Sequence, residues 1–501
     1  MLQENSSNSK QAAWVAIGTF FSFIVGIVTP MILSRYFNKG DYGTYKQVMY
    51  VYHTLLTVFT LGLPKAYAYF LPKYPTTFSR DIISKVTNIF FVLGGIFSVC
   101  LVLFSGVIAS LMNNPDLKMA LIVFSPTPFL LLPTMGLDGI FASFRQTKYL
   151  AYYTIVTRLL TIVCIILPVV LFSGSYILAI IGFDIASLVT FLIALYLKSW
   201  PVRNVEHQKS SLPYRDIFKF SIPLVYASIW GMIIVSANQF FISRYYGNEV
   251  FAEFSNGFME FPFVGMILGS ISAILLPLFS GKDKGDGINY ETLDIWHSAL
   301  LKSAKLIFPM LAFCIFFAEP LMTCMYGDLY AASSVYFLIK NISGFFYIIP
   351  FYPIILAIGK TKEYAHVHMW VAFVVVVIEY VVCMTCDSAI YVAIASEVCQ
   401  LLKVLLLMRV IADYGHKRII DLLPPKPLGR ILLIAVIAAF IPQSLLSLVD
   451  LNKYTMLLVG LMLFLITYFL LCWGFRVSYR EIVSGFIKSR SRLSSVVKLL
   501  P

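Results

Sequence analysis

The sequence is poor in charged residues and has no long polar segment. Only 13% of its 501 residues are charged, whereas 59% are hydrophobic, which is far from the composition of a soluble globular domain. No Gly-x-x-x-x-Gly-Lys-Ser/Thr phosphate loop is present, so the chain is not expected to hydrolyse ATP. The eight cysteines lack zinc or haem spacing, and we predict no metal site, cofactor or catalytic residue.

Long apolar runs dominate the chain instead. A hydrocarbon core of about 30 Å requires about 20 apolar residues per helix. The runs therefore predict an all-α integral membrane fold with about 14 transmembrane helices. They cover residues 12–36, 43–70, 82–112, 117–145, 149–172, 176–198, 216–246, 250–280, 298–326, 332–358, 365–386, 388–413, 428–449 and 454–475.

The net charge of +13 is distributed asymmetrically between the loops. With the N-terminus in the cytoplasm, the cytoplasmic loops receive most Lys and Arg residues, as the positive-inside rule requires. This pattern predicts a multi-pass protein of the bacterial plasma (inner) membrane with both termini cytoplasmic, and no nucleic-acid partner. The first run is expected to be retained as a helix and not cleaved as a signal peptide.

An internal repeat divides the chain. Residues 34–37 (SRYF) recur as residues 243–246 (SRYY), and residues 41–45 (DYGTY) fall in register with residues 250–254 (VFAEF). Six runs separate the copies, so both halves enter the membrane in the same orientation, as in transporters with parallel repeats. The predicted organisation is an N-lobe with spans one to six, a C-lobe with spans seven to twelve, a Pro-containing linker with two added spans, and a basic cytoplasmic tail. These parts cover residues 1–200, 201–413, 414–475 and 476–501.

Charged and polar residues inside the runs are the candidate functional residues, since a charge at a helix centre costs about 2.5–3.5 kcal/mol and needs a cavity, a partner or a route to the interface. In the second run, one helix face carries a polar stripe at i, i+4, i+7, i+11 and i+14. It consists of Lys46, Tyr50, His53, Thr57 and Thr60. In the eighth run, Glu253, Asn256 and Glu260 fall at i, i+3 and i+7, so they also share one helix face.

Simpler interpretations stay open for several of these charges. Arg35, Lys46 and Arg244 are placed where they can snorkel to the interface, and His53 is compatible with helix packing. Glu397 is expected to pair with Lys403 or with another helix.

Residues 34–45 (SRYFNKGDYGTY) resemble the R-x-L-G-x-x-x-[FY]-G-x-Y signature of the polysaccharide transporter family, although Tyr-Phe replaces the usual Leu-Gly. Residues 62–66 (GLPKA) and 70–74 (FLPKY) resemble the end of that family's second helix. The family belongs to the multidrug/oligosaccharidyl-lipid/polysaccharide exporter superfamily. The resemblance covers essentially the whole chain and identifies the superfamily better than the substrate.

The resemblance implies a flippase and not an enzyme. Such a flippase moves undecaprenyl-diphosphate-linked oligosaccharide to the outer leaflet for O-antigen, capsule or exopolysaccharide assembly, by alternating access without ATP. Membrane lipids and other polysaccharide-assembly proteins are the implied partners, and a proton or sodium gradient is an open source of coupling. Cations suit the diphosphate, and acids suit a coupling ion or sugar hydroxyls. The predicted cavity cations are Lys46, Lys65, Arg158, Lys340, Arg35 and Arg244, and the predicted polar or ion-coupling residues are His53, Thr57, Glu253, Asn256 and Glu260.

Three alternatives remain at this stage. A multidrug/cation antiporter of the same superfamily would use an acidic cavity, which Glu253 and Glu260 offer, although the first two runs contain no intramembrane acid. A lipid II flippase would share the plan and differ only in cargo. A membrane-embedded polymerase or scaffold would be expected to have large outer loops or to lack an internal repeat. This sequence has short outer loops and an internal repeat.

Overall fold

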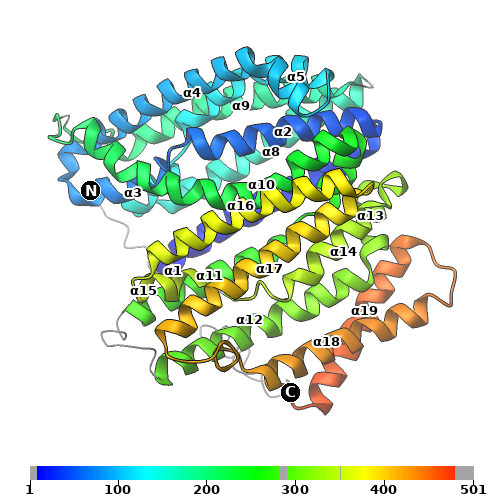
Figure 1. Cartoon of the computed structure of the whole chain (residues 1–501). Helices are drawn as coiled ribbons and strands as arrows, with labels where there is room; N and C mark the ends of the chain where they lie inside the picture. Colours follow the sequence, from blue (N-terminus) through cyan, green and yellow to red (C-terminus); the bar gives the residue numbers. More distant parts are fainter. Residues whose placement is uncertain (1–7, 173, 207, 281–289, 350, 480–501) are drawn as a thin grey trace. The chain divides into compact units, whose positions relative to one another are not determined.

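The computed structural model describes residues 8–172, 174–206, 208–280, 290–349 and 351–479. Within these ranges all regular elements are helices and no strand occurs (Figure 1). Twelve helical segments in the described part of the chain are long and apolar enough to cross a membrane. The predicted all-α integral membrane fold is therefore confirmed.

The predicted count of fourteen spans is not confirmed, because two of the apolar runs form shorter helices. The run 250–280 ends in α11 (Pro262–Ser280), whose described apolar stretch, Phe263–Ser272, is short for a span. The run 332–358 is divided between α14 (Ser333–Gly344) and α15 (Phe351–Ala357). Hydropathy averaged over a span does not detect these interruptions, because most residues at the breaks, such as Phe258, Phe261 and Phe345, are apolar.

The chain separates into two compact units, Met1–Ala252 and Glu253–Pro501. Their boundary falls near the end of α10 (Tyr214–Gly257), which is kinked at a non-helical Gly247 with φ 85° and ψ 174°. A positive φ is readily adopted by glycine because it lacks a Cβ. The predicted division into residues 1–200, 201–413, 414–475 and 476–501 stays a prediction.

The first unit is built from long helices that pack in pairs. α1 packs on α8 and α8 on α9, while α2 contacts both α5 and α9. Its helices before α10 are α1 (Asn8–Tyr36), α2 (Lys39–Phe59), α3 (Pro64–Phe70), η1 (Leu71–Lys73), η2 (Thr76–Phe78), α4 (Ser79–Leu111), α5 (Asp116–Phe124), α6 (Pro126–Leu131), η3 (Leu132–Thr134), α7 (Leu137–Ser143), α8 (Thr147–Leu171), α9 (Tyr176–Ser199) and η4 (Trp200–Val202).

A helix break divides the second predicted span. α2 ends at Phe59, and the backbone then takes positive φ angles at Leu61 (48°) and Gly62 (65°) before Pro64 starts α3. Proline is favoured in the first turn of a helix because backbone N–H groups there make no intrahelical hydrogen bond, so the N–H that proline lacks is not missed. The GLPKA segment singled out in the sequence therefore spans the end of this turn and the first residues of α3.

The second unit has its core around α12, α17 and α18. Ile307, Leu407 and Ala435 are among the buried residues of this core. α18 packs on both α12 and α19, and α14 packs on α17 (Figure 1). The remaining helices of this unit are α12 (Tyr290–Phe316), α13 (Ala318–Tyr326), η5 (Asp328–Tyr330), α16 (Thr361–Thr385), α17 (Ala389–Tyr414), η6 (Ile419–Leu422), α18 (Pro425–Leu446) and α19 (Lys453–Gly474).

The predicted connector before the last two helices contains the short η6. The buried Trp296 indole donates a hydrogen bond to the Leu422 carbonyl oxygen over 3.1 Å, which ties the connector to α12. At its exposed side, the Arg418 guanidinium hydrogen-bonds the Asp421 carboxylate and lowers the pKa of that carboxyl. Of the predicted basic tail, residues 480–501 lie outside the described residues.

Candidate functional site

The predicted polar stripe of α2 contains residues with different roles. Lys46 is half-buried, with its Nζ 5.4 Å from the centroid of the Tyr42 ring. The Tyr50 hydroxyl instead donates to the Ser236 carbonyl oxygen of α10 over 2.9 Å. His53 is exposed, and the half-buried Thr57 hydroxyl turns back to the His53 carbonyl oxygen at 3.4 Å. Lys46 and His53 thus remain available to a ligand, whereas Tyr50 is part of the packing.

A second predicted cation of this unit, Arg158 of α8, is exposed. Among the described residues neither Lys46 nor Arg158 forms an ion pair with a carboxylate. Asp184, a possible partner on α9, accepts a hydrogen bond from Thr127 at 2.5 Å instead. The first unit therefore carries cations whose charge no neighbouring acid neutralises.

The other predicted cations of this unit lie elsewhere. Lys65 is exposed in the first turn of α3, beyond the break that ends α2. Arg35 is exposed in the last turn of α1. The Arg244 guanidinium donates to the carbonyl oxygens of Ser110 and Leu111 at the end of α4. A cation at a helix C-terminus complements the helix dipole, so a packing role accounts for Arg244.

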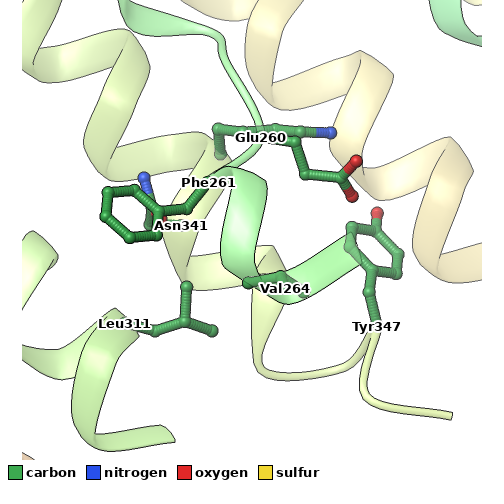
Figure 2. A pocket seen from close by; sticks show the side chains of 8 residues that line it. Glu260, Phe261, Val264, Leu311, Asn341 and Tyr347 are labelled. Carbon is green, nitrogen blue, oxygen red and sulfur yellow. The ribbon is translucent and has the colours of Figure 1, made fainter. Parts of the chain in front are cut away.

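The second unit contains a small pocket beside α14. Glu260, Lys340 and Tyr347 supply its polar lining, and the other lining residues are Phe261, Val264, Leu311, Asn341 and Gly344. Figure 2 shows the Glu260 carboxylate and the Tyr347 hydroxyl directed toward one another. Two of the predicted site residues, Lys340 and Glu260, are thereby brought to one pocket.

Lys340 is held by a buried carboxylate on the neighbouring helix. Its Nζ lies 2.8 Å from Oε1 of Glu397 in α17, and the two side chains are only 15% and 6% exposed. Oε2 of Glu397 accepts hydrogen bonds from the Ser343 hydroxyl and, at 2.7 Å, from the Tyr347 hydroxyl. The Lys340 ammonium also lies 5.0 Å from the centroid of the Phe258 ring. Glu397 is therefore paired with Lys340 on α14, the second of the two alternatives expected from the sequence, while Lys403 donates to Gln400.

The predicted polar residues at the end of α10 are less accessible. Glu253 is half-buried, and Asn256 is completely buried. Only Glu260, which follows α10, is exposed and lines the pocket. No group of three or more His, Cys, Asp or Glu side chains suited to a metal ion occurs in the part of the chain that the structure describes.

Sequence reasoning missed three members of the second site: Ser343, Tyr347 and the role of Glu397 as the partner of Lys340. The signal was present only in part, because Lys340 and Ser343 are three positions apart and share one face of α14. Tyr347 follows the end of α14, where helical spacing no longer applies. Pairing with Glu397, 57 positions away, depends on how α14 packs against α17 and has no local signature.

A family model described as "Polysaccharide biosynthesis protein" matches residues 9–281, which is more than half of the chain. The chain belongs to this polysaccharide biosynthesis family. The predicted recognition is therefore confirmed. No curated protein is a significant match to the chain by sequence.

Several solved structures share the fold. A structure of the lipid II flippase MurJ in an inward closed conformation is 17% identical, with a TM-score of 0.70 over 93% of this chain and 99% of that one. An inward-facing multidrug resistance transporter of the MATE family has 13% identity and a TM-score of 0.55 over 81% and 96% of the two chains. A MOP superfamily transporter from Pyrococcus furiosus has 13% identity and a TM-score of 0.54 over 81% and 95%.

These matches establish the family and the fold. The chain belongs to the polysaccharide biosynthesis family, and it shares the fold of solved multi-pass membrane transporters and flippases. Because the structural relatives are below 25% identity, their likeness shows the fold alone, and the substrate must be argued from this chain's own residues.

Proposed function

We propose that the protein is a flippase for undecaprenyl-diphosphate-linked oligosaccharide in the bacterial inner membrane. It moves the glycolipid from the inner to the outer leaflet, for O-antigen, capsule or exopolysaccharide assembly, by alternating access without ATP hydrolysis. Both termini are proposed to be cytoplasmic, and a proton or sodium gradient is proposed to drive the cycle. The glycolipid, the membrane lipids and other polysaccharide-assembly proteins are the proposed partners.

The observation that carries this proposal is the presence of cations without counter-ions in the first unit. Lys46 and Arg158 have no carboxylate partner among the described residues, and Arg158 is exposed. A diphosphate needs donors that replace its hydration shell, for which Lys supplies a point charge and Arg a bidentate fork. The polyprenyl chain can remain in the lipid while only the polar head crosses.

The remaining proposed contacts follow from position. Lys65 and Arg35 are exposed and can meet a headgroup, and Lys340 lines the pocket of the second unit. Arg244 is retained as an outer-side candidate, although its bonds to α4 favour packing. Thr57 and Glu253 offer hydrogen bonds to sugar hydroxyls, Asn256 supports them from its buried position, and Glu260 is the proposed acid for a coupling ion.

The test is transport by the purified protein in liposomes. Fluorescent undecaprenyl-diphosphate oligosaccharide is incorporated symmetrically, and the rate at which inner-leaflet label becomes accessible to a membrane-impermeant quencher is measured. A charge-assisted hydrogen bond contributes about 1.5–3 kcal/mol, so Lys46→Ala and Arg158→Ala should each slow flipping about tenfold or more. Arg409→Ala is the matched control, because Arg409 is 70% exposed and paired with Asp413.

Transport at the wild-type rate in both variants would refute the role of these cations. A MATE-type cation antiporter is the second candidate function, favoured by the shared fold and by the exposed Glu260. Accumulation or efflux of ethidium by the same liposomes, with no movement of the glycolipid, would establish that alternative. Lipid II, tested as a further labelled substrate, decides between the two flippase cargoes.

A further inference from the structure

Lys340 of the second unit has a carboxylate counter-ion, whereas Lys46 and Arg158 of the first unit have none among the described residues. Lys340 lines the pocket, but its ammonium is 2.8 Å from the Glu397 carboxylate, which is 6% exposed and does not line the pocket. An anion that enters the pocket therefore meets a lysine whose charge is already neutralised. It must compete with Glu397 for that lysine.

We propose that Glu397 is a specificity-determining residue: it is the resident counter-ion of Lys340, and a phosphate group of the substrate displaces it when the headgroup enters this pocket. This inference rests on the proposed function and names a requirement of the same transport cycle. The exchange is non-covalent, since one ammonium–carboxylate contact is replaced by one ammonium–phosphate contact.

The hydrogen bonds of Glu397 make such an exchange feasible. Ordinarily, removing one partner of a buried ion pair leaves the other charge without compensation at a cost of several kcal/mol. Here the opposite oxygen of the carboxylate, Oε2, accepts from both Ser343 and Tyr347. When Lys340 turns to a phosphate, these two hydroxyl donors continue to solvate Glu397. The carboxylate can thus release the lysine without becoming unpaired.

The charge of the entering group decides whether the exchange is favourable. Glu260 lines the same pocket and adds negative charge there, so a phosphate gains attraction only by direct contact with Lys340. A phosphate can replace the carboxylate at Lys340, whereas a neutral headgroup would have to break the ion pair without offering a charge in return.

The experiment is a binding cycle on the full-length protein in detergent. Inorganic diphosphate and undecaprenyl diphosphate are the anionic probes, and undecaprenol is the neutral one. Close charge pairs show coupling energies large enough to change affinity about tenfold or more, so Glu397→Gln should bind both anionic probes at least about tenfold more tightly. Lys340→Met should weaken them by a similar factor. In the double variant the gain from Glu397→Gln should disappear, and undecaprenol binding should not respond.

Asp328→Asn is the matched control. It neutralises an acid that lies 2.7 Å from Lys453 and that does not line the pocket, so affinity for diphosphate should stay at the wild-type value. A charge exchange, Lys340→Glu with Glu397→Lys, keeps an ion pair and moves the cation away from the lining. This variant should retain the thermal unfolding midpoint better than either single charge reversal and should lose the Lys340 contribution to diphosphate binding.

Unchanged or weaker diphosphate binding by a folded Glu397→Gln protein would overturn the inference, as would the same gain in the Lys340→Met background. Failure of the proposed function has a separate signature: the wild-type protein then neither binds undecaprenyl diphosphate nor flips its glycosylated form. If wild-type flipping is normal and the cycle shows no coupling, only the counter-ion exchange is wrong.

Discussion

Asn114 should be a structurally critical polar residue of the first unit. It lies between α4 and α5, is 4% exposed, and donates from Nδ2 to Thr44 Oγ1 at 2.8 Å and to Gln47 Oε1 at 2.6 Å. The Gln47 amide in turn donates to Ser243 Oγ of α10 at 2.7 Å, and Ser243 donates to the Met112 carbonyl oxygen. One buried chain of donors therefore links α2, the α4–α5 turn and α10.

The perturbation is Asn114→Leu. It leaves Gln47 Oε1 buried without this donor, and an unsatisfied buried polar group costs about 1–3 kcal/mol. Thr44 is affected less, because its hydroxyl still donates to the Gly40 carbonyl oxygen at 3.1 Å. Adding the lost hydrogen bonds, of about 1 kcal/mol each, we expect the free energy of unfolding to fall by about 2–4 kcal/mol.

The assay is the SDS-induced unfolding of the purified protein, followed by tryptophan fluorescence. Asn88→Leu is the control, because Asn88 is exposed on α4 and should tolerate an apolar side chain. In the double variant Asn114→Leu with Gln47→Leu, the orphaned acceptor is removed, so much of the loss should be recovered. The reasoning is refuted if Asn114→Leu loses no more stability than Asn88→Leu, or if the two substitutions are additive.

Two further predictions concern packing and a buried acid. A Cβ at Gly43 would lie 2.1 Å from the Asn248 carbonyl oxygen. Gly43→Ala should therefore lower the unfolding midpoint, with a loss of about 1–3 kcal/mol in the free energy of unfolding. Gly231→Ala is the control and should leave the midpoint unchanged, because a Cβ there meets nothing within 4 Å. Glu379 of α16 is 0% exposed, and its carboxylate oxygens have no hydrogen-bond partner of normal geometry within the described ranges. Glu379→Leu should therefore raise the midpoint in the same SDS titration, and a lowered midpoint would show that the acid stabilises the fold.

Hydropathy sufficed to predict the class of the fold because a membrane span needs only length and apolar composition. It did not predict the break inside the second span, since this break depends on backbone conformation. Leu61 and Gly62 adopt positive φ angles there, within one apolar run. The positive φ at Gly247, by contrast, falls between two predicted spans, 216–246 and 250–280. Hydropathy therefore predicted the presence of membrane spans better than it predicted their number.

The candidate sites were predictable to the extent that residues shared one helix. Lys46 and His53 were found because their spacing places them on one face of α2, and Lys340 was found as an intramembrane charge. Arg158 could not be placed relative to this stripe from spacing, because it lies on a different helix. The same limit applied to Glu397, whose partner was settled only by the packing of α14 against α17.

The two units differ in what a phosphate would have to displace. Lys46 and Arg158 have no carboxylate partner among the described residues, so an anion that binds them loses only water. Lys340 must first exchange Glu397, so its contribution is reduced by the strength of that ion pair. Removing the pair's acid should strengthen anion binding only through Lys340. The effect of Glu397→Gln should therefore persist undiminished in the Lys46→Ala background and vanish in the Lys340→Met background, which tests whether counter-ion exchange is confined to one cation.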